Sequence, residues 1–121
     1  MAKGDDIQER LMNFSVAIIS LCEKLPGTQA GRHLAGQLLR CGTSPAPNYG
    51  EARGAESKKD FVHKLGIVLK ELNESGIWLE VARRNQLLVS GVVSPVQDEC
   101  TQLSKIISSS ISTARRGRKQ L

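Results

Sequence analysis

Four segments of the chain carry apolar residues at steps of three and four, the spacing that places them on one face of a helix. These segments run from about residue 6 to 25, 28 to 54, 57 to 87 and 94 to 114. A helix with one apolar face must bury that face against another element. Four such faces joined by short connections predict an all-α fold, an antiparallel up-down-up-down four-helix bundle.

The composition agrees with packed helices. The chain has 121 residues, enough for one domain with a core, and only 3% of them are aromatic. An aliphatic core of this kind suits a helical bundle better than a β-sandwich. We expect residues 1–5 to be a disordered N-terminus, residues 6–114 to form the bundle and residues 115–121 to be a basic flexible tail.

The second segment is the least regular, because it contains the run Ser44-Pro45-Ala46-Pro47. A proline inside a continuous helix costs about 3 kcal/mol. The cost falls if Ser44 caps a new helix and Pro45 takes its first position, where the missing N–H has no intrahelical partner anyway. We therefore predict that helix 2 is kinked or restarted near Ser44-Pro45 and continues to about Gly54.

Capping residues stand near the other expected helix starts. They are Asp6 with Glu9, Thr28, Ser57 with Asp60, and Ser94 before Pro95. The last of these predicts that the fourth helix begins at Pro95, after a loop centred on Gly91.

The sequence has no motif of an enzyme. It lacks a nucleophile elbow, a zinc-protease motif and a glycine-rich phosphate loop. Its only histidines are His33 and His63, and the pair Asp60 and His63 is more typical of a surface ion pair than of a ligand set. We expect no catalysis, no cofactor, no metal and no small-molecule substrate.

The cysteines and the hydropathy indicate a cytoplasmic protein. The number of cysteines is odd, and all of them fall on apolar helical faces: Cys22, Cys41 and Cys100. This pattern favours buried, reduced thiols. No signal peptide is recognisable, and no apolar run approaches the roughly 20 residues that a membrane span needs. We therefore expect no membrane association.

A polar stripe follows the second segment. Arg40, Ser44, Asn48 and Glu51 are separated by steps of four, four and three, so they share one face if the helix resumes nearly coaxially. Such a stripe predicts a polar network that fixes packing register, with Arg40 and Glu51 meeting partners from another helix or another subunit. The alternative is an exposed polar face. Glu71 is expected on a solvated face or at a contact between subunits.

The positive charge is concentrated near the end of the chain. The net charge is +5, of which residues 115–121 carry +4, leaving +1 for residues 1–114. A basic tail is typical of a nucleic-acid contact, although a solvated, frayed end is equally compatible. The candidate nucleic-acid contacts are Arg53, Lys58, Lys59, Arg115, Arg116, Arg118 and Lys119.

Two expectations weigh against a compact nucleic-acid site. We expect the turn that contains Arg53, Lys58 and Lys59 to lie at the opposite end of the bundle from the tail. Aromatic residues that stack on bases are also scarce, because Phe14 and Phe61 are expected in the core.

The central polar residues resemble the signature of a known family. The signature is Q-x-x-R-x-x-x-S-x-x-x-N-x-x-E-[GA] followed by S-x-x-[DE]-F. The residues of this chain that are similar to it are Gln37, Arg40, Ser44, Asn48, Glu51-Ala52, Ser57 and Asp60-Phe61. This signature is that of a bacterial four-helix-bundle family, the rRNA intervening-sequence proteins, often labelled S23 ribosomal protein. Relatives are accessory variability proteins of diversity-generating retroelements.

The resemblance implies a ring-like homopentamer of four-helix bundles without catalytic activity. For the retroelement relatives it implies a scaffold that binds a reverse transcriptase and its template RNA through basic surface. The residues expected at packing or subunit interfaces are Gln37, Arg40, Ser44, Asn48, Glu51 and Glu71.

Two functions follow as hypotheses. The first is a non-enzymatic oligomeric scaffold or accessory protein associated with nucleic acid, either RNA or a complex of reverse transcriptase and RNA. The second is a protein–protein interaction module with no direct nucleic-acid role.

Overall fold

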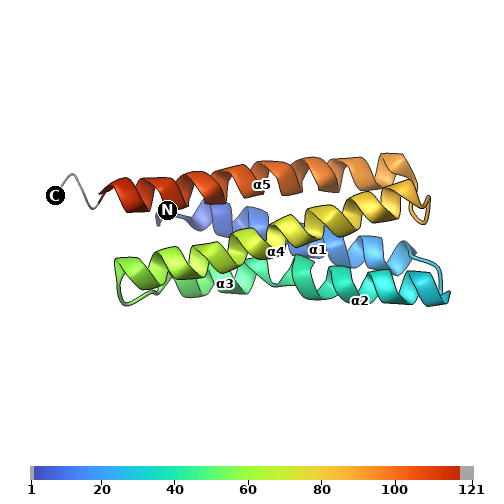
Figure 1. Cartoon of the computed structure of the whole chain (residues 1–121), viewed down its shortest axis with the longest axis horizontal. Helices are drawn as coiled ribbons and strands as arrows, with labels where there is room; N and C mark the ends of the chain where they lie inside the picture. Colours follow the sequence, from blue (N-terminus) through green and yellow to red (C-terminus); the bar gives the residue numbers. More distant parts are fainter. Residues whose placement is uncertain (1, 118–121) are drawn as a thin grey trace.

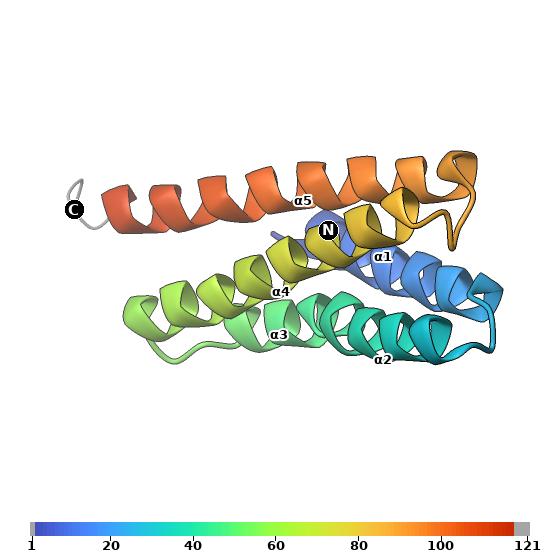
Figure 2. The same ribbon diagram turned by 45° about the vertical axis from the view of Figure 1, so that its right-hand side comes forward.

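The computed structural model describes residues 2–117, which form five helices and, within that range, no strand (Figure 1). The helices are α1 (Asp5–Lys24), α2 (Gln29–Thr43), α3 (Pro45–Arg53), α4 (Lys58–Arg84) and α5 (Ser90–Gly117). Helices α2 and α3 follow one another along the same side of the molecule and together make one of four rods (Figure 2). The predicted all-α four-helix bundle is confirmed.

The chain reverses direction at each of the three connections between rods (Figure 1). Helix α1 packs against α2, α3 and α5, and α4 packs against the same three helices. Helices α1 and α4 are therefore diagonal partners, as the up-down-up-down order requires. The core between the rods is mainly aliphatic, and its buried aromatic side chains are Phe14 and Tyr49. Its largest fully buried side chains include Leu11, Phe14, Ile18, Leu38, Leu65, Leu72, Leu79, Leu103 and Ile107.

The second rod restarts at Ser44, as predicted, but without the expected cap. Pro45 takes the first position of α3, and Ser44 keeps a right-handed helical backbone with no side-chain cap. A capping hydroxyl accepts from the second or third amide of a helix, and the third residue here is Pro47, which has no N–H. The Ser44 hydroxyl instead accepts a hydrogen bond from the Asn48 side chain at 2.8 Å.

Two of the other predicted caps are confirmed. The Thr28 hydroxyl accepts from the Gly31 amide at 3.1 Å, and the Ser57 hydroxyl accepts from the Asp60 amide at 3.0 Å. The start of α1 differs from the expectation, because Asp5 is its first residue and Gly4 precedes it at φ 90° without a side-chain cap. The predicted cap by Asp6 and Glu9 and the boundary of a disordered segment at residue 5 are therefore wrong.

The last connection also differs from the prediction. Helix α4 ends at Arg84 rather than near residue 87, and α5 begins at Ser90, so Pro95 lies inside the helix. The early start buries Val93 completely and brings Leu88 into the core, and this gain offsets the hydrogen bond that Pro95 cannot donate. Helix α5 continues to Gly117, past the expected end at residue 114. Arg118 and Lys119 lie outside the described residues.

None of the helices between residues 2 and 117 combines the length and apolar character that crossing a bilayer requires.

Candidate functional site

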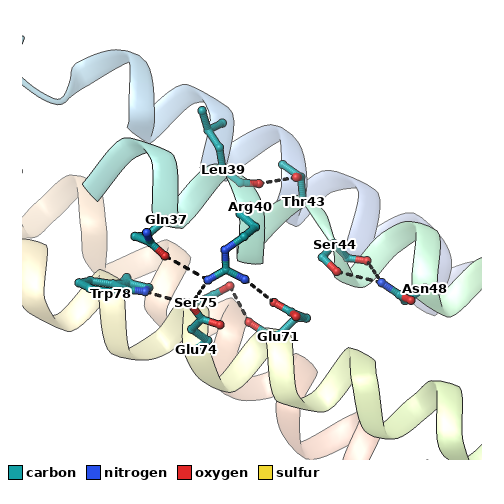
Figure 3. A network of polar contacts seen from close by, with 10 residues as sticks. All are labelled: Gln37, Leu39, Arg40, Thr43, Ser44, Asn48, Glu71, Glu74, Ser75 and Trp78. Carbon is teal, nitrogen blue, oxygen red and sulfur yellow. Dashed lines mark hydrogen bonds and ion pairs between the residues drawn. The ribbon is translucent and has the colours of Figure 1, made fainter. Parts of the chain in front are cut away.

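A cluster of polar side chains joins α2 to α4, and we call it the polar seam: Gln37, Arg40, Glu71, Glu74 and Trp78 (Figure 3). The Arg40 guanidinium donates to the Glu74 carboxylate, to Glu71 at 3.5 Å and to the Gln37 side-chain oxygen at 3.1 Å. Trp78 donates its indole N–H to Glu74 at 3.2 Å. The seam is thus a closed set of donors and acceptors that fixes one rotational register between the two helices.

The electrostatics of the polar seam follow from these contacts. Hydrogen bonds from Arg40 and then Trp78 hold the pKa of Glu74 below its ordinary value, while Glu74 raises the pKa of Arg40. The Arg40 side chain is 52% exposed, so water screens part of this interaction. His33 extends the seam toward the start of α2, because its ring contacts Trp78 edge-on at a centroid distance of 5.9 Å.

A buried serine lies beneath the polar seam. Ser75 has no exposed surface, and its hydroxyl donates to the backbone oxygen of Glu71 at 2.8 Å. Sequence reasoning missed Ser75, as well as the roles of Glu74 and Trp78. A signal for Ser75 was present, because it stands three residues after Leu72 and four before Leu79 and so continues their apolar face.

The predicted polar stripe finds its partners within the chain. Arg40, Gln37 and Glu71 meet in the polar seam. Asn48 of α3 donates its side-chain N–H to the hydroxyl of Ser44, the residue before α3, at 2.8 Å. Glu51 pairs with Lys64 of α4 at 3.0 Å. The stripe therefore contacts another helix of the same chain, which is one of the two expected kinds of partner. A contact with another subunit stays a prediction.

The start of α4 and the last turn of α5 lie at the same end of the bundle (Figure 1). Four basic residues belong to these two turns, and we call this the basic end: Lys58, Lys59, Arg115 and Arg116. The connection between α3 and α4 lies there, beside the end of α5. The Lys58 Nζ atom is 3.7 Å from the position that a Cβ atom on Gly117 would take. The expectation that these segments occupy opposite ends is wrong, because the second and fourth rods run in the same direction and finish at the same end.

The candidate contact Arg53 differs from the other cations. It donates to the Asp5 carboxylate at 2.6 Å and to the backbone oxygen of Lys3 at 3.1 Å, so it ties the N-terminal segment to α3. That contact lowers the pKa of Asp5. Within residues 2–117, no ion pair engages Lys58, Lys59, Arg115 or Arg116.

An open groove of about 510 Å³ lies between the N-terminal segment, the start of α4 and the last turns of α5, and we call it the end groove. Phe61 packs against the core, as expected, but it is only half-buried and also lines the end groove. The end groove is lined by Lys3, Phe61, Lys105, Ile106, Ser109, Ser110, Thr113 and Ala114.

The three cysteines form no disulfide bond with one another. Cys41 and Cys100 are buried, as expected, whereas Cys22 is half-buried, which differs from the expectation. Burial raises the pKa of Cys22 to about 11 and that of Cys100 to about 12, which leaves both protonated and weakly nucleophilic near neutral pH. Within residues 2–117, no three His, Cys, Asp or Glu side chains are grouped so that they would hold a metal ion.

Comparison with known proteins places the chain in a family. A search of curated proteins finds no match. A solved structure from the S23 ribosomal protein family, a protein of unknown function from Bacteroides thetaiotaomicron VPI-5482, is 33% identical with a TM-score of 0.82. The similarity covers 87% of this chain and 97% of that one. The model of the 23S rRNA-intervening sequence proteins matches residues 5–109, and the chain therefore belongs to that family.

Proposed function

We propose that this chain is a non-enzymatic helical scaffold of the cytoplasm that assembles with copies of itself and contacts RNA through the basic end. The observation that carries the proposal is the convergence of Lys58, Lys59, Arg115 and Arg116 at one end without ion pairs among the described residues. Unpaired cations on two adjacent helices match the repeating charge of a nucleic-acid backbone.

The start of α4 strengthens the positive potential at the basic end. A helix N-terminus carries a partial positive charge, and Lys58 and Lys59 are the first two residues of α4. The low net charge of residues 1–114 does not weaken this argument, since association with phosphates depends on local rather than summed charge.

Self-association rests on the family resemblance and on exposed apolar surface. Met12, Val16 and Ile19 are exposed at steps of four and three along α1, which forms an apolar stripe on its outer face. A second copy of the chain would cover this stripe, and a ring of five copies is the assembly that the resemblance implies. The partner RNA would then be free or bound to a reverse transcriptase, as in the retroelement relatives.

An electrophoretic mobility shift with a structured RNA at two salt concentrations tests the RNA contact. We expect a shift at 50 mM salt that weakens at 200 mM, and a loss of about tenfold or more in affinity for Lys58→Glu/Lys59→Glu. Acidic residues are favourable in the first turn of a helix, so this variant should keep its fold. Lys24→Glu/Arg32→Glu, at the other end of the bundle, is the matched control. Absence of any shift at 50 mM would refute the RNA contact.

A second candidate is a protein-interaction module with no direct nucleic-acid role. The apolar stripe of α1 favours it, because such surfaces dock proteins more often than nucleic acids. Deleting residues 115–121 separates the two functions. Binding of a partner protein should survive the deletion if the second function is correct, whereas RNA affinity should fall if the first is correct. Light scattering measures the subunit number in both cases.

A further inference from the structure

We propose that the end groove holds one unpaired nucleotide of a single-stranded RNA, with its base against Phe61 and its phosphates near Lys3 and Lys105. This inference rests on the proposed RNA contact and assigns it a specific site. It also goes beyond the basic end, because neither Lys3 nor Lys105 belongs to that cluster.

The size of the end groove fits such a ligand. A volume of about 510 Å³ lies within the range of about 300–1,000 Å³ that is typical of small-molecule sites. A lone inorganic anion would leave most of that space unfilled. The end groove is also open along one side, so a nucleotide can enter while remaining part of a longer chain.

The lining combines three kinds of group that a ribonucleotide requires. Phe61 supplies an aromatic ring for a base, and Lys3 and Lys105 supply positive charge for phosphates. Ser109 and Thr113 supply hydroxyls that hydrogen-bond a sugar 2′-hydroxyl. None of the described lining residues is a carboxylate, so the end groove favours an anionic ligand.

The end groove is continuous with the basic end along two helices. On α5, Lys105, Ser109, Thr113 and Arg116 are separated by steps of four, four and three and thus share one face, and Arg116 contacts the Thr113 hydroxyl at 3.5 Å. On α4, Lys58 stands one turn before Phe61. An RNA strand with one nucleotide in the end groove would therefore meet further cations on its neighbouring phosphates.

The aromatic residue selects single strands over duplexes. Bases in a duplex are stacked on one another, and their faces are not available to a side chain. Without Phe61 the site would reduce to two lysines and a row of hydroxyls, which would bind the backbone of either form.

Fluorescence anisotropy with a labelled oligouridylate of ten nucleotides tests the end groove in the full chain. We expect Phe61→Leu to weaken binding about fivefold or more, because it keeps an apolar side chain but removes the stacking ring. We expect Lys105→Glu to weaken binding about tenfold and to make the logarithmic salt dependence shallower by about 0.7, the loss of one phosphate contact. Lys24→Glu is the matched control and should stay within about twofold of the wild type.

The outcomes distinguish this inference from the proposed function. If the wild type binds the oligouridylate and both end-groove variants bind as tightly as Lys24→Glu, the end groove is refuted while RNA binding at the basic end stands. If the wild type binds no RNA at 50 mM salt, both are refuted. Equal affinity of the wild type for a ten-residue polyglutamate would show recognition of charge alone and would also overturn the inference.

Photocrosslinking keeps the test valid should Phe61→Leu fold poorly. An oligouridylate that contains 4-thiouridine is irradiated with the wild-type protein, and the crosslinked peptides are sequenced. Crosslinks to Phe61 or within residues 105–114 support the inference. Crosslinks confined to other parts of the chain, Lys58 and Lys59 included, contradict it.

Discussion

The polar seam and the basic end use similar residues for opposite purposes. In the polar seam, Arg40 is matched by Glu71 and Glu74, and each group finds its partner on a neighbouring helix. At the basic end, Lys58 and Arg116 come from two helices and the described residues offer them no carboxylate in an ion pair. Charges that are satisfied within the chain set helix register, whereas charges that are left unsatisfied are available to another molecule.

Chain direction brings basic last turns to both ends of the bundle. The last turns of α3 and α5 carry arginine at the basic end, and those of α1 and α4 carry Lys24, Arg83 and Arg84 at the other end. Basic residues are favourable in the last turn of a helix because of the partial negative charge there. The two ends differ in pairing, because Glu80 engages both Arg83 and Arg84, whereas the described residues form no ion pair with Arg115 or Arg116.

The largest effect should come from removing the buried support of the polar seam. Leu72 is fully buried beneath the seam, and we expect Leu72→Ala to lower the free energy of unfolding by about 2–5 kcal/mol. Leu39→Ala makes the same chemical change on the exposed side of α2 and should cost far less. Urea unfolding measures both. Equal losses would show that the core does not support the seam in the way described.

The next largest effect should be a different response of the two regions to salt concentration. If two phosphates contact the basic end and the end groove, raising salt from 50 to 200 mM should lower the affinity for single-stranded RNA about sevenfold. The free energy of unfolding should change less over the same range, because the buried apolar core supplies most of it and exposed ion pairs contribute little. Anisotropy and urea unfolding at both concentrations measure the two responses. An RNA affinity insensitive to salt would contradict a phosphate contact.

Lowering the pH should weaken the ion pairs and hydrogen bonds that Glu74 and Glu80 of α4 make. Contacts with Arg40 hold the pKa of Glu74 below 4.5, and contacts with Arg83, Arg84 and Gln97 do the same for Glu80. A lowered folded-state pKa means that the stabilisation is complete above about pH 4.5 and is lost as the pH falls toward the folded value. The difference in unfolding free energy between wild type and Glu80→Gln should therefore shrink from pH 6 to pH 3. A difference that stays constant would contradict the assigned contacts.

The smallest effect should be the coupling within the polar seam. Arg40→Gln and Glu74→Gln each remove one partner of a half-exposed pair, so each should cost less than the core substitution. Their double variant should lose less than the two single losses added together, since the shared contact can be lost only once. Urea unfolding of the wild type, the two single variants and the double variant measures the four free energies of this double-mutant cycle. Additive losses would show that the contact contributes nothing to stability.

The fold was predictable because helix burial leaves a regular mark in the sequence. Residues such as Leu65, Val68 and Leu72 repeat at the helical period whatever their neighbours are, and all three are buried. The start of α5 was not predictable in the same way. Pro95 is typical of a first helical position, but burial of Val93 two residues earlier outweighed that local preference.

The candidate site was less predictable than the fold. The spacing of Arg40 and Glu51 indicated a shared polar face, yet the choice of Glu74 and Lys64 as partners depends on how α4 is rotated against α2 and α3. Periodicity also cannot tell a residue at the edge of a groove from one inside the core, which is why Phe61 was assigned to the core. These properties depend on the relative placement of helices, which no single segment encodes.

The position of the N-terminal segment has a practical consequence for anyone who handles this protein. Arg53 holds Lys3 beside the end groove, so a purification tag fused before residue 2 would emerge next to the surface where RNA is expected. A histidine-rich tag could then mimic or mask the natural contact in a binding assay. Gly27, in the connection between α1 and α2 at the far end of the bundle, has open space around it and is the safer position for a label.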